Sequence, residues 1–318
     1  MEEKQINRYL RRRFSPLGWW LVAYYVLMTI MVLVSVIQEV LIGYLRAFGE
    51  GNFLFLPGMN AIAGNAWGYV AAAGVALLVM LAMKGGEHFR QEIMAKGQSM
   101  TAGRFVMLLC LCSGCQFANS IWIGILEWIL NRFGLSALAM LEEVSGASDT
   151  FSMFLYSALL APILEEIFFR GYILRELRPY GKRFAILGSA FLFGIFHGNL
   201  LQTPYAFLIG LVLGYITVEY SVLWAMALHL FNNLVLADLL SRVMSRLPVP
   251  VADGLSVLIF GGFFLGAVGI LIAKRREIGE YIHGEWVDRR CVKCFFTSPG
   301  VVILTLMMAG SMISLLFA

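Results

Sequence analysis

Residues 161–171 read APILEEIFFRG and place two adjacent carboxylates and an arginine inside an apolar run long enough to cross a bilayer. An ionisable side chain at the centre of a membrane-spanning helix costs about 2.5–3.5 kcal/mol on insertion scales, so such groups are rare unless they are paired or functional. Glu166 and Arg170 stand four residues apart, which predicts an ion pair along one helical face. Glu165 lies on another face and is not neutralised by that pair. The segment is therefore either a structural ion cluster or part of a functional site.

The composition determines the class of protein. Of 318 residues, 60% are hydrophobic and only 14% are charged, and the mean hydropathy is +0.79. The apolar residues come in long blocks, which is typical of a polytopic membrane protein and not of a soluble domain. We therefore predict an all-α fold, a transmembrane helical bundle. The net charge of +4 says little about nucleic acid, because the basic residues sit at the ends of the apolar blocks and indicate topology. We expect the lipid bilayer as a partner and no nucleic acid.

The apolar blocks predict about eight to nine spans in three regions. Residues 1–150 form an N-terminal membrane region with about three spans, residues 151–240 a core with about four, and residues 241–318 a C-terminal region with about two. The expected spans lie near 15–48, 61–83, 105–130, 151–174, 184–201, 204–220, 222–240, 254–273 and 299–318. The fifth, sixth and seventh are close to the minimum length. Pro162 lacks a backbone N–H and predicts a loosened helix just before the carboxylates.

The distribution of basic residues predicts the orientation. Lys and Arg concentrate in residues 1–14, 84–104, 175–183 and 274–293, whereas residues 131–150 are mainly acidic. By the positive-inside rule the N-terminus is cytoplasmic and the C-terminus is outside, in a multi-pass protein of the cell membrane. Arg242 and Arg246, in an outer loop, are the exception. Four aromatic residues that follow the N-terminus are interpreted as interfacial anchors: Trp19, Trp20, Tyr24 and Tyr25.

Two later spans also contain polar residues. Residues 193–199 read FGIFHGN and residues 229–233 read HLFNN, so His229 and Asn233 share one helical face. A single histidine in a membrane is most often a hydrogen-bonded packing residue. At a rise of 1.5 Å per residue, however, Glu165, His197 and His229 all lie about 10–20 Å from the cytoplasmic helix ends. We therefore expect the three to meet at one level.

Such a cluster suits hydrolytic chemistry. Imidazoles and carboxylates ligate divalent metals, and zinc hydrolases use two histidines and a glutamate with an open position for water. A carboxylate can also activate water, and an amide can donate to an oxyanion. Glu165, His197 and His229 are thus candidate ligands for a divalent metal such as zinc. No H-E-x-x-H helix is present, so the ligands would come from separate helices.

The three motifs together resemble a known family. The pattern is E-E-x-x-x-R at Glu165, Glu166 and Arg170, then F-x-x-x-H at Phe193 and His197, then H-x-x-x-N at His229 and Asn233. Their order, spacing and membrane setting over residues 151–240 are similar to those of the CAAX-protease and bacteriocin-processing (CPBP) family. This family comprises the type II CAAX prenyl endopeptidases and their bacterial relatives.

The resemblance implies an intramembrane metalloendopeptidase whose site opens to the cytoplasm. Glu165 would activate water, His197 and His229 would hold the metal or polarise the scissile carbonyl, and Asn233 would stabilise the oxyanion. The substrate would be a membrane-associated peptide or protein, either prenylated and CAAX-type or bacteriocin-like. With the supporting Glu–Arg pair, the predicted site comprises Glu165, Glu166, Arg170, His197, His229 and Asn233.

Cysteines provide a competing hypothesis. Cys110, Cys112 and Cys115 fall in the third span, and Cys291 and Cys294 form a C-x-x-C in the last cytoplasmic loop. Two C-x-x-C pairs can indicate zinc. The first pair lies in an apolar helix, however, and the second has only basic polar neighbours. A reducing cytoplasm also disfavours a disulfide. We therefore expect neither a structural zinc site nor a disulfide among these cysteines.

Two other function classes remain open. A secondary transporter or proton relay would also place Glu and His residues at mid-membrane. Such a protein usually shows two related halves, and the first three spans repeat neither the 161–171 nor the 229–233 pattern. A non-catalytic scaffold would use the Glu–Arg pair but would not require Glu165, His197 and His229 at a common depth.

Overall fold

Each predicted apolar block contains a helix in the computed structural model, which describes residues 3–49, 65–93, 95, 97–136, 150–283 and 288–317. These residues contain no β-strand, which confirms the all-α prediction. The N-terminal region consists of α1 (Glu3–Gly49), α3 (Trp67–Lys84), the short polar α4 (Gly86–Ile93), α5 (Ala102–Leu130) and the single turn η1 (Asn131–Phe133). The α1 helix is unbroken over 47 residues, a length of about 70 Å. It is therefore much longer than the hydrocarbon layer is thick.

The core region begins with one helical span from Phe151 to Tyr180. It runs through α7 (Phe151–Phe154), η2 (Leu155–Leu160), α8 (Ala161–Glu165), η3 (Glu166–Leu174), α9 (Arg175–Leu177) and η4 (Arg178–Tyr180). Both η2 and η3 are π-helical. Pro162 lies in the first turn of α8, directly after the π-helical η2. The irregularity expected near Pro162 is thus a change of helix type and not a break in the span.

The rest of the core consists of α10 (Lys182–Phe196), α11 (Thr203–Glu219), α12 (Val222–Leu230), the π-helical η5 (Phe231–Leu239) and α13 (Leu240–Met244). The C-terminal region contains α14 (Val249–Ala273), α15 (Arg275–His283), α16 (Arg289–Phe296) and α17 (Pro299–Ser314). The segment that carries Cys291 and Cys294 was predicted as a loop and is instead α16. Both thiols point into the protein, because each cysteine is buried.

Fewer of the described helices are long enough to span a membrane than the sequence has apolar blocks. Six helices of the described chain are long and apolar enough to cross a membrane, or up to seven if α16 and α17, which are bent by 57°, form one span. The predicted fifth and sixth spans are α10 and α11, with 15 and 17 residues. Their lengths of about 23 and 26 Å fall short of a hydrocarbon core of about 30 Å. Most of α10 is buried in protein, so lipid thickness does not determine its length.

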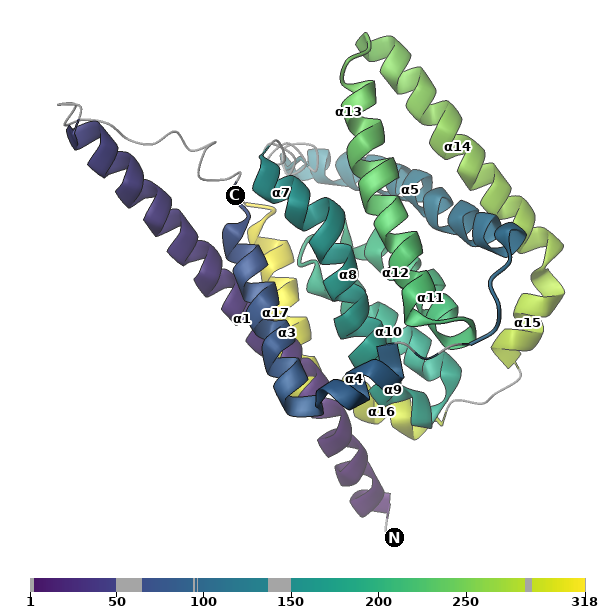
Figure 1. The fold of residues 1–318 in the computed structure, drawn as a ribbon. Helices are drawn as coiled ribbons and strands as arrows, with labels where there is room; N and C mark the ends of the chain where they lie inside the picture. The colour runs from purple at the N-terminus through teal and green to yellow at the C-terminus, as the bar shows by residue number, and fades with distance from the viewer. Residues whose placement is uncertain are drawn as a thin grey trace.

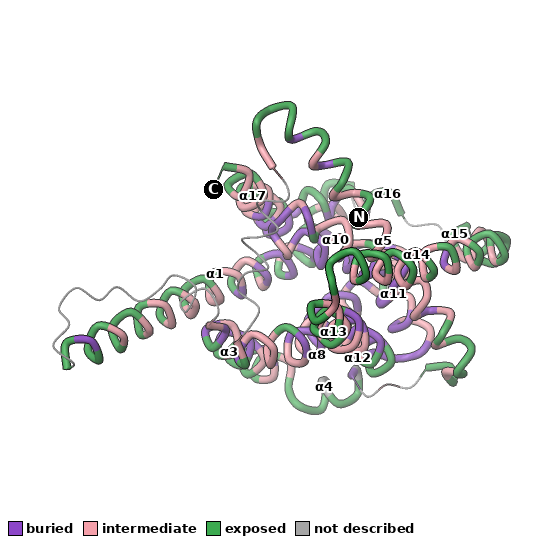
Figure 2. Tube along the Cα trace, turned by 90° about the horizontal axis from the view of Figure 1, so that it is seen from above, coloured by how far each residue is buried: buried purple, intermediate pink, exposed green. Residues whose placement is uncertain are grey.

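The helices share two common ends (Figure 1). The N-terminus, α4, α9, α15 and α16 lie at one end of the bundle, and the C-terminus and the α13–α14 turn lie at the other. The predicted basic segments therefore gather at one end. Buried residues concentrate around α8, α10, α11 and α12, whereas the second half of α1 is mostly exposed or intermediate (Figure 2). Its exposed residues include Leu33, Ile37 and Leu45, which are apolar and suit contact with lipid.

Two glycines bring α1 and α17 into direct backbone contact. A Cβ atom at Gly18 would lie 2.1 Å from the carbonyl carbon of Gly300, and one at Gly300 would lie 2.1 Å from the backbone oxygen of Ser15. The Ser15 hydroxyl accepts a hydrogen bond from the Gly300 N–H at 3.0 Å. Small residues allow this approach, as is usual where membrane helices pack. One turn before Gly18, Phe14 packs edge-on against Phe295, which joins α1 to α16.

Candidate active site

The two adjacent glutamates lie at the junction of α8 and η3. Glu165 is the last residue of α8, and Glu166 is the first residue of η3. The side chain of Glu166 is fully buried, whereas that of Glu165 is 25% exposed. π-Helical turns are rare and occur frequently at functional sites. This one places a buried and an accessible carboxylate side by side.

Arg170 binds the buried carboxylate, as the i, i+4 spacing predicted. Its Nη1 lies 3.1 Å from Glu166 Oε1, and both side chains are fully buried. The guanidinium group lies over the Phe193 ring, 4.4 Å from its centroid, and Nη2 donates to the Gly210 carbonyl at 3.3 Å. A pair this deep needs such extra contacts to offset its desolvation. Arg170 therefore connects η3 to both α10 and α11.

His229 joins the two glutamates. It lies near the end of α12 and is buried, with Nδ1 2.9 Å from Glu166 Oε1. Because a carboxylate only accepts hydrogen bonds, Nδ1 carries the proton and Nε2 of the neutral ring has the lone pair. Nε2 lies 3.8 Å from Glu165 Oε2, beyond direct hydrogen-bond distance. Of the three residues expected to meet, Glu165 and His229 thus lie close together.

His197 lies beside this group, next to Phe193. It directly follows α10, and its Nδ1 is 2.8 Å from the Phe193 carbonyl oxygen, so Nδ1 donates and Nε2 is the free nitrogen. The Phe193 ring contacts both imidazoles edge-on, with centroid distances of 4.9 Å to His197 and 5.9 Å to His229. Gly198 follows with φ +65° and ends the helix in the left-handed conformation. The Phe193 ring therefore lies in contact with both His197 and His229 and links the two histidines.

Asn233, on η5, faces the fourth span. Its Nδ2 donates to the Ser157 carbonyl of η2 at 3.2 Å. Its Oδ1 accepts from Asn232 Nδ2 at 3.1 Å, and this bond sets which way the Asn233 amide points. The donor end of Asn233 is therefore directed toward the helix that carries the glutamates.

A chain of polar side chains behind Asn233 was missed by the sequence reasoning. Asn232 Nδ2 also donates to the Tyr205 hydroxyl at 3.1 Å, and that hydroxyl donates to Gln116 Oε1 at 2.8 Å. The chain links η5 to α11 and to α5. One signal was present: Asn232 is a second amide directly beside Asn233. Only Asn233 was predicted as a site residue, because its i, i+4 spacing places it on one helical face with His229.

Two tyrosines near Glu165 were also missed. The hydroxyls of Tyr24 and Tyr156 hydrogen-bond to each other, and both interact electrostatically with Glu165. Tyr24 was predicted to be an interfacial anchor, but it is only 6% exposed and stacks on Phe196 with a centroid distance of 5.5 Å. The reason is that α1 packs its Tyr24 face against the fourth span and not against lipid. These residues line the accessible side of Glu165.

Glu165, His197 and His229 are the predicted ligands of a divalent metal. Among the described residues, no group of three or more His, Cys, Asp or Glu side chains is placed to hold a metal ion. Glu165 and His229 approach each other, but the third predicted ligand, His197, does not complete a cluster. The orphaned buried carboxylate atom, Glu166 Oε2, belongs to a residue already paired with Arg170. The structure thus brings two of the three predicted ligands together. The five cysteines are free thiols.

One comparison with known proteins matches the part of the chain that carries this site. Residues 147–235 match the family model described as type II CAAX prenyl endopeptidase Rce1-like, in agreement with the family that the motifs resemble. The match includes every residue of the predicted site. Neither a curated protein nor a solved structure gives a match to the chain.

Proposed function

We propose that this chain, with its Rce1-like domain over residues 147–235, is an intramembrane endopeptidase that hydrolyses a peptide bond of a membrane-associated substrate. The substrate would be a prenylated CAAX-type chain or another small membrane-bound peptide. One observation carries the proposal: accessible Glu165 lies 3.8 Å from the Nε2 atom of His229, which a buried Glu–Arg pair holds in place. A water molecule fits between two acceptors at that separation.

Glu165 would act as the general base. It takes a proton from the water, whose oxygen then attacks the scissile carbonyl carbon and forms a tetrahedral oxyanion. The same proton passes to the leaving amine when the C–N bond breaks, so Glu165 ends the cycle as a carboxylate. His229 Nε2 would accept the second water proton in a hydrogen bond and so orient the nucleophile. This assignment uses the exposed carboxylate for chemistry and the buried one for support.

Glu166 and Arg170 would act through His229. The carboxylate of Glu166 accepts the Nδ1 proton and thereby fixes the tautomer that leaves Nε2 as an acceptor. Arg170 in turn pairs with Glu166 and holds its carboxylate in a fully buried position. Neither side chain needs to contact the substrate. Both are positioning residues in this proposal.

Asn233 would stabilise the oxyanion. Its Nδ2 carries two hydrogens, of which one is bound by the Ser157 carbonyl and one is available to a substrate oxygen. Asn232, Tyr205 and Gln116 would hold the amide in this orientation. His197 would offer the lone pair of Nε2 as a hydrogen-bond acceptor or metal ligand, because Nδ1 carries the proton.

Zinc binding by Glu165, His197 and His229 stays a prediction, and no step above depends on it. If a divalent ion binds there, it would supply Lewis-acid polarisation of the carbonyl. We further propose that the chain resides in the cell membrane with its N-terminus and the mouth of the site on the cytoplasmic side. The gathering of the basic segments at one end supports this orientation.

The proposal is tested by cleavage of a farnesylated C-a-a-X peptide by the purified full-length protein. Glu165→Gln keeps the shape of the side chain but removes the base, so turnover should fall about 10²–10⁴-fold while the melting temperature is unchanged. Glu277→Gln, which alters an exposed carboxylate on α15, is the control and should cleave like the unmodified chain. Wild-type turnover by Glu165→Gln would refute the assignment of the base. No cleavage of prenylated or unprenylated peptides by the unmodified protein would refute the proteolytic function.

Metal analysis of the same preparations tests the ligand prediction. The unmodified protein should carry about one equivalent of zinc, and a His197→Ala, His229→Ala double variant should carry none. Equal metal content in the two proteins would contradict these ligands, as would the absence of metal from both.

A further inference from the structure

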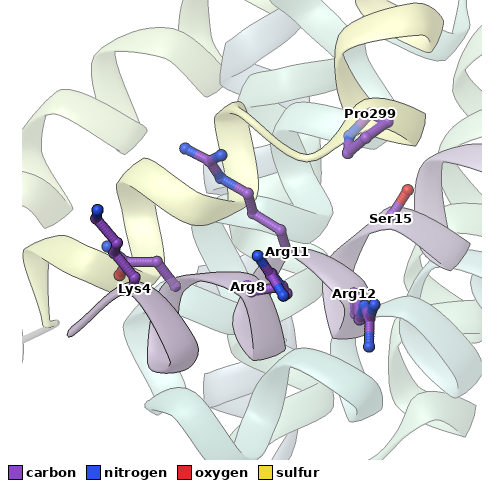
Figure 3. A pocket seen from close by; sticks show the side chains of 7 residues that line it. Lys4, Arg8, Arg11, Arg12, Ser15 and Pro299 are labelled. Carbon is purple, nitrogen blue, oxygen red and sulfur yellow. The ribbon is translucent and has the colours of Figure 1, made fainter. Parts of the chain in front are cut away.

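A basic pocket lies at the opposite side of α1 from the core (Figure 3). It has a volume of about 490 Å³ and is lined by Lys4, Asn7, Arg8, Arg11, Arg12, Ser15 and Pro299. Six of these residues recur on one face of the first four turns of α1, and Pro299 faces them from the start of α17. The lining contains four cations and no acidic residue. None of the functions assigned above uses this pocket.

The pocket walls are held by specific contacts. Arg11 Nε donates to Thr297 Oγ1 at 3.1 Å, which joins α1 to the turn between α16 and α17. The hydrogen bond from Gly300 N–H to Ser15 closes the end at which the two helices meet. On the far face of α1, Leu10, Phe14 and Leu17 are buried in the core, so the helix cannot rotate its basic face away. The cations are therefore presented on a fixed surface.

The cations of the pocket have no acidic partners. Lys4, Arg8 and Arg12 are exposed, and within the described part of the chain none of them forms an ion pair. Arg13, on the same helix, differs because it hydrogen-bonds Tyr180 outside the pocket. Topology alone requires basic residues at this end of α1, but it does not require them to converge on one concave site. A concave cluster of unpaired cations suits a compact anion.

The position of the pocket identifies the source of the anion. Ser15 and Pro299 mark the level at which α1 and α17 enter the apolar layer, and Trp19, one turn further, is 45% exposed. Exposed tryptophans of membrane helices lie at the level of the lipid headgroups. Cations just outside the hydrocarbon meet the phosphates of anionic lipids there. We propose that this pocket binds the phosphoryl group of an anionic phospholipid headgroup and so fixes the α1–α17 junction in the membrane.

The experiment titrates dioleoyl-phosphatidylglycerol onto the full-length protein in detergent and counts bound lipids by native mass spectrometry. Each cation near an anionic lipid strengthens binding about fivefold. The double variant Arg8→Gln, Arg12→Gln should therefore raise the Kd for the lipid about 30-fold. Arg8→Lys with Arg12→Lys keeps the charges and should retain binding. Arg275→Gln with Arg276→Gln, an equal loss of charge on α15, is the matched control and should bind like the unmodified chain.

Four outcomes would overturn the proposal. Equal weakening by the pocket variant and the α15 control would show diffuse electrostatic attraction, and unchanged binding by the pocket variant would show that the pocket is not used. Equal binding of dioleoyl-phosphatidylcholine would exclude selection of an anionic lipid. A competition experiment with inorganic phosphate distinguishes the lipid from a free anion. At millimolar concentration, phosphate should not displace the bound lipid. Displacement there would assign the pocket to a free phosphate.

Discussion

Glu165 and Glu166 are neighbours in sequence whose surroundings give them different tasks. The buried glutamate has two structural partners at Oε1, Arg170 at 3.1 Å and His229 at 2.9 Å. The accessible one lies 3.8 Å from His229 and interacts electrostatically with Tyr24 and Tyr156. A carboxylate that must take up a proton in each cycle has to reach water. Burial and pairing thus distinguish the proposed base from the proposed supporting residue.

This difference predicts separate effects on stability. Glu166→Gln leaves the Arg170 guanidinium buried without its counter-charge, and breaking a buried pair in this way costs about 3–5 kcal/mol. The melting temperature in detergent should therefore fall clearly for Glu166→Gln and stay constant for Glu165→Gln. Both variants should lose cleavage activity. Identical melting curves for the two variants would contradict the division of roles.

At the scale of helices, irregular turns and close crossings build the site. The π-helical segments η2, η3 and η5 carry Ser157, both members of the buried pair and Asn233, so the polar contacts coincide with departures from α-helical geometry. The short α10 and α11 complete the wall behind them. On the other side, the Gly18–Gly300 crossing fixes α17 against α1.

That crossing predicts the effect of a single methyl group. Gly18→Ala would place a Cβ atom 2.1 Å from backbone, which cannot move aside as a side chain can. Overpacking of this kind costs about 1–3 kcal/mol, so the melting temperature should fall. Gly310→Ala, in α17, is the control, because a Cβ atom there meets no heavy atom within 4 Å. It should be neutral or stabilise by up to about 1 kcal/mol. Equal melting temperatures for the two variants would refute a tight crossing.

Much of this arrangement could be predicted from the sequence, because the determining geometry is local. The Glu166–Arg170 pair follows from helical spacing, and the approach of His229 follows from equal depth in the membrane. The contacts of Gln116 and Tyr205 could not be predicted, since they depend on how α5 packs against the core. The prediction for Tyr24 was wrong for a similar reason. Its position in the sequence suits the membrane interface, but the face of α1 that carries Tyr24 packs against the fourth span. Tertiary packing, which periodicity does not encode, decides both.

At the scale of the whole molecule, charge separates the two ends of the bundle. The end formed by α4, α9, α15 and the N-terminus carries the basic segments. Arg242, one of the two exceptions, lies at the other end and forms an ion pair with Asp238 at 2.8 Å. A paired arginine contributes less free positive charge than an unpaired one. The asymmetry between the ends is thus greater than the sequence count indicates.

The proposed orientation predicts which positions a membrane-impermeant thiol reagent reaches in intact cells. Arg246→Cys, at the α13–α14 end, should be labelled from outside, and Glu280→Cys, on α15, should be labelled only after the cells are opened. The unmodified chain is the control for its own five cysteines, of which three are buried and two are partly buried. Labelling of both positions from the same side would show that the number of crossings between them is even.

The i, i+4 placement of Glu166 and Arg170 also affects how the chain enters the membrane during synthesis. Both residues belong to one span, so their charges can neutralise each other as soon as that helix forms. Glu165 has no such neighbour and must wait for His229, which is synthesised 63 residues after Glu166. At about 5–20 residues per second that interval lasts several seconds. During it the fourth span lacks the His229 contact of Glu165, and the partial exposure of that side chain lowers the cost of the delay.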